Sequence, residues 1–236
     1  MTANRSTVGF RVFTDIERPP SDVLALYREL ETTNLADAMY GMNVMDAGIR
    51  PLIPPSSRVV GPALTCSISP GNGLMIRKAI EIAQPGDVLV VNGFGNLQRA
   101  VVGGNVLISM AAKGIVALIL DGVVRDLDEA RRVGLAVYAR GSVPRAGTNP
   151  QGRGEVNVPV ACGGVAVLPG DVVVADEDGV VVVPRVDAAA LATYAAAVQR
   201  QKGSAADFEQ RWAAARAGQT PPSIDALLRE QGCAIL

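Results

Sequence analysis

The amino-acid sequence predicts an α/β fold built on a parallel sheet that is covered on both faces. Two apolar runs, at residues 88–92 and 115–121, are too continuous for strands with one solvated face. Each run follows a segment with helical features, at residues 72–83 and 104–113. Later apolar runs follow Pro-Gly-Asp or Asp-Gly turn signals, so we expect antiparallel hairpins in the second half of the chain.

Two short helices are expected before the sheet begins. Ser21 follows two prolines and is expected to cap the first helix, and residues 32–34 offer caps for the second. Residues 58–68 then have the composition of one or two strands, broken by a Gly-Pro pair. Asn72 is expected to cap the helix that follows them.

The second half of the chain divides into short strands and a helical tail. A Gly/Pro/Asn-rich loop is expected at residues 141–154. Residues 1–185 are expected to form one α/β domain, and residues 186–236 a C-terminal helical extension that is interrupted at Gly203-Ser204 and at Thr220-Pro-Pro. Because an Ala-rich helix gains most of its stability from packing, the extension is expected on a neighbouring subunit or on its own domain. The expected strands lie at residues 135–139, 156–160, 165–168, 172–175 and 180–183.

Charge and composition exclude several classes of function. The 236 residues carry 22 basic and 23 acidic side chains, so no net field favours nucleic acid or an anionic membrane. Only three cysteines occur, far apart, so we expect neither a disulfide framework nor a CxxC motif. No apolar run approaches the roughly 18 residues of a membrane span, and no signal peptide is recognisable. A cytoplasmic protein without nucleic-acid or membrane partners is expected.

The chain contains no histidine, which removes Ser-His-Asp triads, Cys-His pairs and imidazole metal sites. Catalysis must therefore use carboxylates, arginine, lysine, water or a metal ion bound through oxygen. Lys78, Lys113 and Lys202 are expected within a helix, at a helix end and in the tail. None of these places favours the desolvated lysine that a Schiff-base aldolase needs.

Two glycine-rich segments follow or precede predicted elements. The first, Gly93-Phe-Gly95, lacks the third glycine of a dinucleotide-binding fingerprint, because Gln98 stands at that position. The second, Gly103-Gly104, precedes a helix whose first N–H groups could bind a carboxylate or phosphate. An ordinary loop and helix cap is the alternative interpretation of the second segment.

The segment from Asp121 to Asp126 lies directly after a buried strand, where open α/β sheets place their ligands. Arg125 can bind a carboxylate or enolate with two hydrogen bonds, and Asp126 can coordinate a hard divalent cation. Alternatively, Asp126 and Glu129 form a helix-capping box. Asp121 is expected to be a ligand, a group that orients one, or a turn residue. The acids at residues 176–178 are expected in a hairpin turn, with a metal site as the alternative.

Five motifs, taken together and in order, resemble the RraA-like family over about residues 33–184. That family contains class II pyruvate aldolases, which act on 4-hydroxy-4-methyl-2-oxoglutarate and 4-carboxy-4-hydroxy-2-oxoadipate, and the RraA regulators of ribonuclease E. The motifs are Gly86-Asp-Val-Leu-Val-Val, Gly103-Gly-Asn-Val-Leu, Leu120-Asp-Gly-Val-Val-Arg-Asp126, Val158-Pro-Val-Ala-Cys-Gly-Gly164 and Pro169-Gly-Asp-Val-Val-Val-Ala-Asp-Glu-Asp-Gly-Val-Val-Val-Val-Pro184.

The resemblance implies a layered αββαβ domain of the swivelling β/β/α type, assembled as a homotrimer or homohexamer with sites between subunits. The aldolase residues that match Arg125 and Asp126 bind pyruvate and coordinate Mg²⁺ or Mn²⁺. The matching helix start supplies substrate-binding N–H groups, here from Gly104, Asn105, Val106 and Leu107. The regulators lack the aspartate that matches Asp126, so its presence here favours the metal-dependent branch.

Two positions depart from the aldolase pattern. The aldolases carry an acid where this chain has Asn105, which can hydrogen-bond a water but cannot take its proton. They also use a carboxylate from the C-terminal helical region of a neighbouring subunit, where Glu209 is the nearest acid here.

The leading hypothesis is a divalent-metal-dependent lyase that cleaves a 4-hydroxy-2-oxo acid to pyruvate, with oxaloacetate decarboxylation as a side activity. Arg125, Asp126 and Asn105 are its expected catalytic residues, and Asp126 its metal ligand. A lyase for a sugar-acid-derived substrate would use the same groups. The alternative from another class is a non-catalytic regulator that binds a protein partner such as ribonuclease E.

Overall fold

The structure, a computed structural model, describes residues 7–147, 152–202, 207–218 and 224–235. The chain divides into two compact units, residues 1–198 and 199–236. The second unit contains α7 (Phe208–Arg216) and α8 (Asp225–Glu230), and neither helix has a buried residue. Within the described ranges, no helix is long and apolar enough to cross a membrane.

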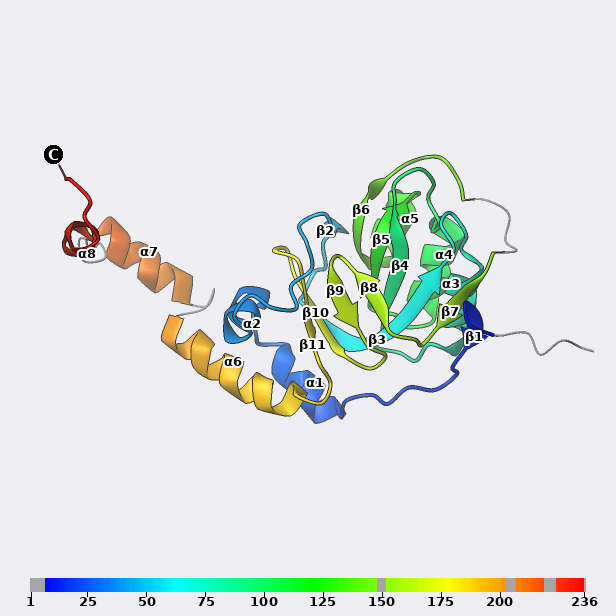
Figure 1. The fold of residues 1–236 in the computed structure, drawn as a ribbon, viewed down its shortest axis with the longest axis horizontal. Helices are drawn as coiled ribbons and strands as arrows, with labels where there is room; N and C mark the ends of the chain where they lie inside the picture. The colour runs from blue at the N-terminus through cyan, green and yellow to red at the C-terminus, as the bar shows by residue number, and fades with distance from the viewer. Residues whose placement is uncertain (1–6, 148–151, 203–206, 219–223, 236) are drawn as a thin grey trace, which may run out of the picture. The chain divides into compact units, whose positions relative to one another are not determined.

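The first unit is organised around one large mixed sheet (Figure 1). Its four central strands, from β3 to β6, are parallel, as the two continuous apolar runs predict. β10 and β11 join the sheet through the first half of β3. The strand order is β1 (Phe10–Val12), β7 (Gly154–Val156), β3 (Val59–Ile68), β4 (Val88–Asn96), β5 (Ala117–Val124), β6 (Ala136–Ser142) and β2 (Arg50–Ile53).

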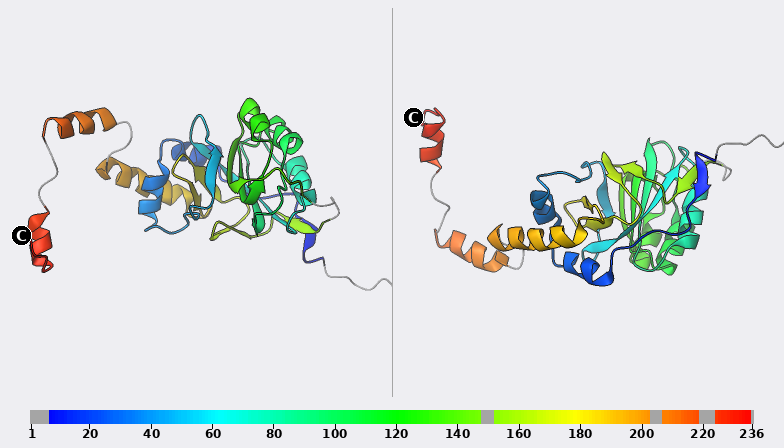
Figure 2. Two further views of the ribbon diagram at one scale, coloured as in Figure 1. Left: turned by 90° about the horizontal axis from the view of Figure 1, so that it is seen from above. Right: turned by 60° about the horizontal axis from the view of Figure 1, so that its bottom comes forward.

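Alternate residues of the central strands enter two different cores, because successive side chains of a strand point to opposite faces. Leu89 and Val91 pack beneath the three helices on one face, and Val88 and Val90 pack beneath the hairpins on the other. The predicted coverage of both faces is therefore confirmed, with helices on one side only (Figures 1 and 2). The helices are α3 (Leu74–Ile82), α4 (Gly104–Ala112) and α5 (Leu127–Val133); the hairpins are β8 (Val160–Cys162) with β9 (Val165–Val167) and β10 (Val172–Ala175) with β11 (Val180–Val183).

A third core joins the β10–β11 hairpin to α1 (Ser21–Tyr27), α2 (Thr32–Ala38) and the start of α6 (Ala188–Lys202). The hydroxyl of Tyr27 donates a 2.6 Å hydrogen bond to the carbonyl of Ala188. Ala192 and Ala195 are buried in the same core. The first turns of the predicted extension thus pack on the first unit.

Several local expectations can be compared with the structure. Asn72 does cap α3, because its Oδ1 accepts the N–H of Leu74 at 2.9 Å. Ser21 does not cap α1; it is the first helical residue, and no side-chain cap precedes it. β1 was not expected, because the residues around it have no recognisable periodicity. β6 extends to Ser142 and so includes the first two residues of the loop expected at 141–154. The expected interruptions at residues 203–204 and 220–222 lie outside the described residues.

Asp121 lies within the buried strand β5 and orients residues of neighbouring segments. Its carboxylate accepts Arg140 Nε at 2.5 Å and the N–H of Gly163 at 3.0 Å. Arg140 also binds Asp46 at 3.0 Å, and this hydrogen bond lowers the pKa of Asp46. The carboxylates in turn raise the pKa of Arg140. Asp121 therefore links the turn between β8 and β9 to strand β5 of the sheet through a hydrogen bond.

The variant Asp121→Ala is expected to lose about 2–3 kcal/mol of unfolding free energy, because Arg140 and the Gly163 N–H lose a partly buried partner. Urea denaturation measures this loss. The matched control is Asp128→Ala, whose 84% exposed side chain pairs with Arg131. It should change stability by less than about 0.5 kcal/mol. Equal stability of the two variants would contradict the assigned role of Asp121.

Candidate active site

The candidate site forms where the end of β5 meets the segment before α4. Val102 pairs with Val124 in a parallel bridge, and Arg125 N–H donates to the carbonyl of Val102 at 3.0 Å. These contacts bring Arg125 and Asp126 beside Gly103 and Gly104. The site lies at the carboxyl ends of the parallel strands, where α/β sheets usually bind their ligands.

Asp126 links the two segments through its side chain. Its Oδ2 accepts the N–H of Gly104 at 3.0 Å and lies 3.4 Å from Arg125 Nε. Its backbone is left-handed, with φ of 60°, and α5 has no side-chain capping bond. The capping-box alternative is therefore wrong, because the carboxylate crosses to α4 and does not cap its own helix.

Most of the predicted site residues line one pocket of about 250 Å³, called here the inner pocket. The side chains of Arg125 and Asp126 are 40% and 43% exposed, so both can reach a ligand from solvent. Leu107 is the exception among the predicted residues, because its side chain is buried in the core beneath the sheet. The lining residues are Gly73, Leu74, Arg77, Ala100, Val101, Gly103, Gly104, Asn105, Val106, Arg125, Asp126, Ala146 and Gly147.

The four backbone amides of residues 104–107 differ in what they can offer a substrate. The N–H groups of Val106 and Leu107 donate to the carbonyl of Gly103, at 2.9 and 3.1 Å. The N–H of Gly104 donates to Asp126. Asn105 N–H has no acceptor among the described residues, and it lies in the first turn of α4, where the helix dipole favours an anion.

Glu129 is a site residue that the sequence interpretation placed only in a capping box. A Cβ atom added to Gly104 would overlap the Glu129 carboxylate, so this carboxylate lies across the first turn of α4. Its position on α5, three residues after Asp126, is the signal that could have identified it, since residues at that spacing share a helix face.

The donor set fits a hard divalent cation. Asp126 and Glu129 supply carboxylate oxygens, and Asn105 supplies a side-chain amide at the pocket. No cluster of three or more His, Cys, Asp or Glu side chains suited to a metal occurs in the described part of the chain. A cation here would therefore have few protein ligands and several waters, which is the coordination that Mg²⁺ prefers.

Other chemically active side chains lie elsewhere. Lys78 pairs with Glu81 at 2.6 Å, and Lys113 is exposed at the end of α4; the Lys202 side chain is outside the described residues. Burial raises the pKa of the Cys66 and Cys162 thiols, so neither is a nucleophile at neutral pH. Asp176 binds Thr32 Oγ1 at 2.6 Å and the N–H of Asp178, as expected for a residue of the β10–β11 turn.

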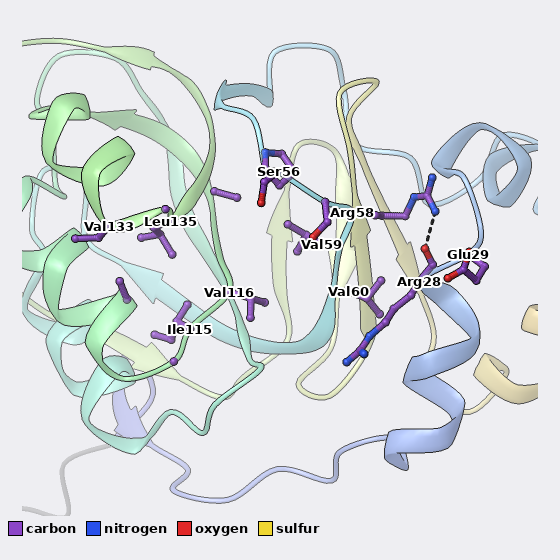
Figure 3. Close-up of a pocket in the computed structure, with 16 residues that line it drawn as sticks. Arg28, Glu29, Ser56, Arg58, Val59, Val60, Ile115, Val116, Val133 and Leu135 are labelled. Atoms are coloured by element: carbon purple, nitrogen blue, oxygen red, sulfur yellow. Dashed lines mark hydrogen bonds between the residues drawn. The ribbon is translucent and has the colours of Figure 1, made fainter. Parts of the chain in front are cut away.

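A larger cavity of about 650 Å³ lies at the opposite end of the sheet, beside the residues that precede β5 and β6 (Figure 3). One wall carries Arg58, whose Nη1 donates to the carbonyl of Arg28 at 2.8 Å. The cavity contains neither Arg125 nor Asp126, and it lies at the amino ends of the parallel strands. We therefore assign the chemistry to the inner pocket.

The variant Gly103→Ala tests how closely the two segments must approach. A Cβ at residue 103 would lie 2.8 Å from Asp126 Oδ2 and 2.9 Å from Arg125 Nε, so both side chains must move. The backbone of Gly103 is extended, with φ of −136°, which alanine tolerates. We expect about a 10- to 100-fold loss of catalytic turnover, with a melting temperature within a few degrees of the wild type. Unchanged turnover would contradict the placement of the site.

The fold and this pocket define a class of α/β protein with an Arg-Asp pair facing a helix N-terminus at the carboxyl edge of a parallel sheet. The chain belongs to the RraA-like family, since the Aldolase/RraA family model matches residues 32–182. The resemblance seen in the sequence motifs is thereby confirmed.

Curated relatives carry the names of aldolases. A Halalkalibacterium halodurans protein, provisionally named a 4-hydroxy-4-methyl-2-oxoglutarate aldolase, is 37% identical over 164 residues, covering 70% of this chain and 77% of that protein. The 4-hydroxy-4-methyl-2-oxoglutarate aldolase of Thermus thermophilus is 38% identical over 128 residues, covering 54% of this chain and 77% of the relative.

Two solved structures of RraA proteins are also similar to this chain. Streptomyces coelicolor RraAS2, described as an unusual member of the RNase ES inhibitor RraA family, matches with a TM-score of 0.71 and 28% identity, covering 83% of this chain and 99% of that chain. The RNA-processing inhibitor RraA of Thermus thermophilus matches with a TM-score of 0.59 and 33% identity, covering 66% and 93%. These structures confirm the expected RraA-like α/β fold.

Proposed function

We propose that this protein is a divalent-metal-dependent lyase that cleaves a 4-hydroxy-2-oxo acid, such as 4-hydroxy-4-methyl-2-oxoglutarate, to pyruvate. The observation that carries the proposal is the convergence of Arg125, Asp126 and the first turn of α4 on one pocket, joined by the 3.0 Å Asp126–Gly104 hydrogen bond. Relatives 37% and 38% identical that carry aldolase names support it.

The chain's own residues have distinct roles in this proposal. The Asn105 N–H in the first turn of α4 binds the substrate carboxylate, and the Asn105 side chain hydrogen-bonds a pocket water. Arg125 donates to the 2-oxo oxygen and stabilises the negative charge that develops there. Asp126 would hold Mg²⁺ or Mn²⁺, with Glu129 beside it. When bound, such a cation supplies positive charge next to the 2-oxo group and lowers the pKa of water.

The reaction breaks the C3–C4 bond of the substrate. Its electron pair moves into the 2-oxo group and gives an enolate, while the C4 hydroxyl loses its proton to water and becomes a carbonyl. C3 of the enolate then takes a proton and gives pyruvate. Oxaloacetate would react in the same pocket as a side activity, because loss of CO₂ from C3 leaves the same enolate.

The proposal includes a homotrimer or homohexamer in the cytoplasm, with a small 2-oxo acid as substrate and neither nucleic acid nor a membrane as partner. The exposed faces of α7 support assembly, because Phe208 and Trp212 are 52% and 51% exposed and stack on each other. Glu209 lies on the same helix, so a neighbouring copy could supply it to a site.

A non-catalytic regulator of ribonuclease E is the second candidate function. The two RraA structures favour it, as does Asn105, which cannot replace an acid in proton transfer. Asp126 disfavours it, since its carboxylate is turned into a solvent-accessible pocket.

A coupled pyruvate-release assay separates the two candidates. Purified protein is tested with 4-hydroxy-4-methyl-2-oxoglutarate and oxaloacetate, with Mg²⁺, Mn²⁺ or chelator, after subtraction of cleavage by free metal. The lyase proposal predicts turnover that chelator removes and added metal restores. Absence of turnover, together with inhibition of ribonuclease E by the protein, would instead establish the regulator.

A further inference from the structure

A second pocket of about 430 Å³, called here the outer pocket, adjoins the inner pocket between α3 and α4. Arg77, Asn105 and Val106 line both pockets. A substrate whose 2-oxo acid end occupies the inner pocket can therefore extend past these residues. The outer pocket is completed by Ile80, Glu81 and Ser109.

Arg77 brings a positive charge to the junction of the two pockets. It lies on α3, one turn after Gly73, and its side chain is exposed. No ion pair or hydrogen bond of its guanidinium occurs in the described part of the chain. Glu81, the acid one turn further on α3, pairs instead with Lys78 at 2.6 Å. Arg77 is thus available to an anionic ligand.

The inner pocket already has a positively charged side chain of its own, Arg125. Arg125 lies 3.4 Å from Asp126 and is assigned to the 2-oxo oxygen. The C1 carboxylate is assigned to the first turn of α4. Arg77 lines both pockets, whereas Arg125 lines the inner pocket and not the outer one, so a carboxylate at the far end of the substrate is matched to Arg77.

We infer that Arg77 binds a distal carboxylate of the substrate and so selects 4-hydroxy-2-oxo dicarboxylic acids over monocarboxylic ones. The inference rests on the proposed lyase function and adds a specificity-determining residue to it. Loss of one charge-assisted hydrogen bond predicts about a 10- to 100-fold loss in affinity or kcat/KM for the dicarboxylic ligand.

The test compares wild type, Arg77→Gln and Arg77→Lys, with Lys113→Gln as the control, because Lys113 is exposed at the end of α4 and lines neither pocket. Turnover is measured with 4-hydroxy-4-methyl-2-oxoglutarate and with the monocarboxylic 4-hydroxy-2-oxopentanoate. Arg77→Gln should lose 10- to 100-fold in kcat/KM for the first and stay within about two-fold for the second. Arg77→Lys should recover part of the loss, and Lys113→Gln should match the wild type.

Binding provides a readout that does not depend on cleavage. Calorimetry with Mg²⁺ gives the affinities for 2-oxoglutarate and for its monocarboxylic analogue 2-oxopentanoate. The wild type should prefer 2-oxoglutarate, and Arg77→Gln should remove that preference without weakening 2-oxopentanoate. Equal weakening of both ligands, or of neither, would overturn the inference. If binding follows the expectation and no substrate is cleaved, the lyase proposal fails and the role of Arg77 in binding stands.

Discussion

The variant Asp126→Asn is expected to lower metal-dependent pyruvate release by about 100-fold or more, while the folded structure stays intact. Asparagine removes the charge that holds the cation, and even ligand-orienting residues around metal sites contribute about 10- to 100-fold. The fold is expected to survive because residue 126 has a left-handed backbone, with φ of 60°, which asparagine tolerates as well as aspartate. Its side-chain oxygen can still accept the Gly104 N–H.

Two measurements accompany this variant: the rate of pyruvate release across Mg²⁺ concentrations, and the circular dichroism melting curve. Asp128→Asn is the matched control, because Asp128 lies two residues further along the chain and binds Arg131 on the outside of α5. It should keep wild-type turnover. Full activity of Asp126→Asn at low Mg²⁺ would remove Asp126 from the metal site, and unfolding of the variant would indicate a structural role.

The variant Arg125→Lys is expected to lower kcat by about 100- to 1000-fold, the typical cost of removing a donor that stabilises an oxyanion. An ammonium is a point charge and does not reproduce the planar pair of donors that a guanidinium gives to a carboxylate or enolate. The backbone of Arg125 stays fixed, since its N–H bonds to Val102 at 3.0 Å whatever the side chain.

Steady-state kinetics separates this effect from simple loss of binding. The loss should fall mainly on kcat, because the charge on the 2-oxo oxygen is largest in the transition state. Arg131→Lys, with its side chain 54% exposed on the next helix, is the control and should behave as wild type. A rise in KM alone for Arg125→Lys would show that Arg125 only binds the ground state.

The central strands could be predicted from the sequence because a strand that is buried on both faces consists of consecutive apolar residues. Residues 88–91 and 117–120 are uninterrupted apolar residues, and all of them are buried in the structure. β1 was missed because three residues with a half-exposed face carry no periodicity, and their pairing with β7 comes from distant sequence. The Ser21 cap was wrong because the helix begins one residue earlier than the capping pattern requires.

Local patterns identified Arg125 and Asp126 but could not decide between a ligand site and a capping box. That choice depends on Gly104, which is 22 residues away in sequence and donates its N–H to the Asp126 carboxylate. Arg77 and Glu129 were not selected as site residues for the same reason. The place of Arg77 follows from how α3 packs beside α4, and spacing within one helix does not contain that information. The spacing of Glu129 from Asp126 indicates a shared face of α5, but not that this face lies against the first turn of α4.

The central claim is that Arg125 and Asp126 stabilise a pyruvate enolate, and proton NMR of pyruvate in D₂O tests it without knowledge of the full substrate. The wild type with Mg²⁺ should exchange the methyl protons of pyruvate for deuterium, because each exchange passes through the enolate. Chelator or Asp126→Asn should abolish that exchange, and Asp128→Asn should preserve it. No exchange by the wild type with Mg²⁺ or Mn²⁺, or equal exchange by Asp126→Asn, would contradict the account.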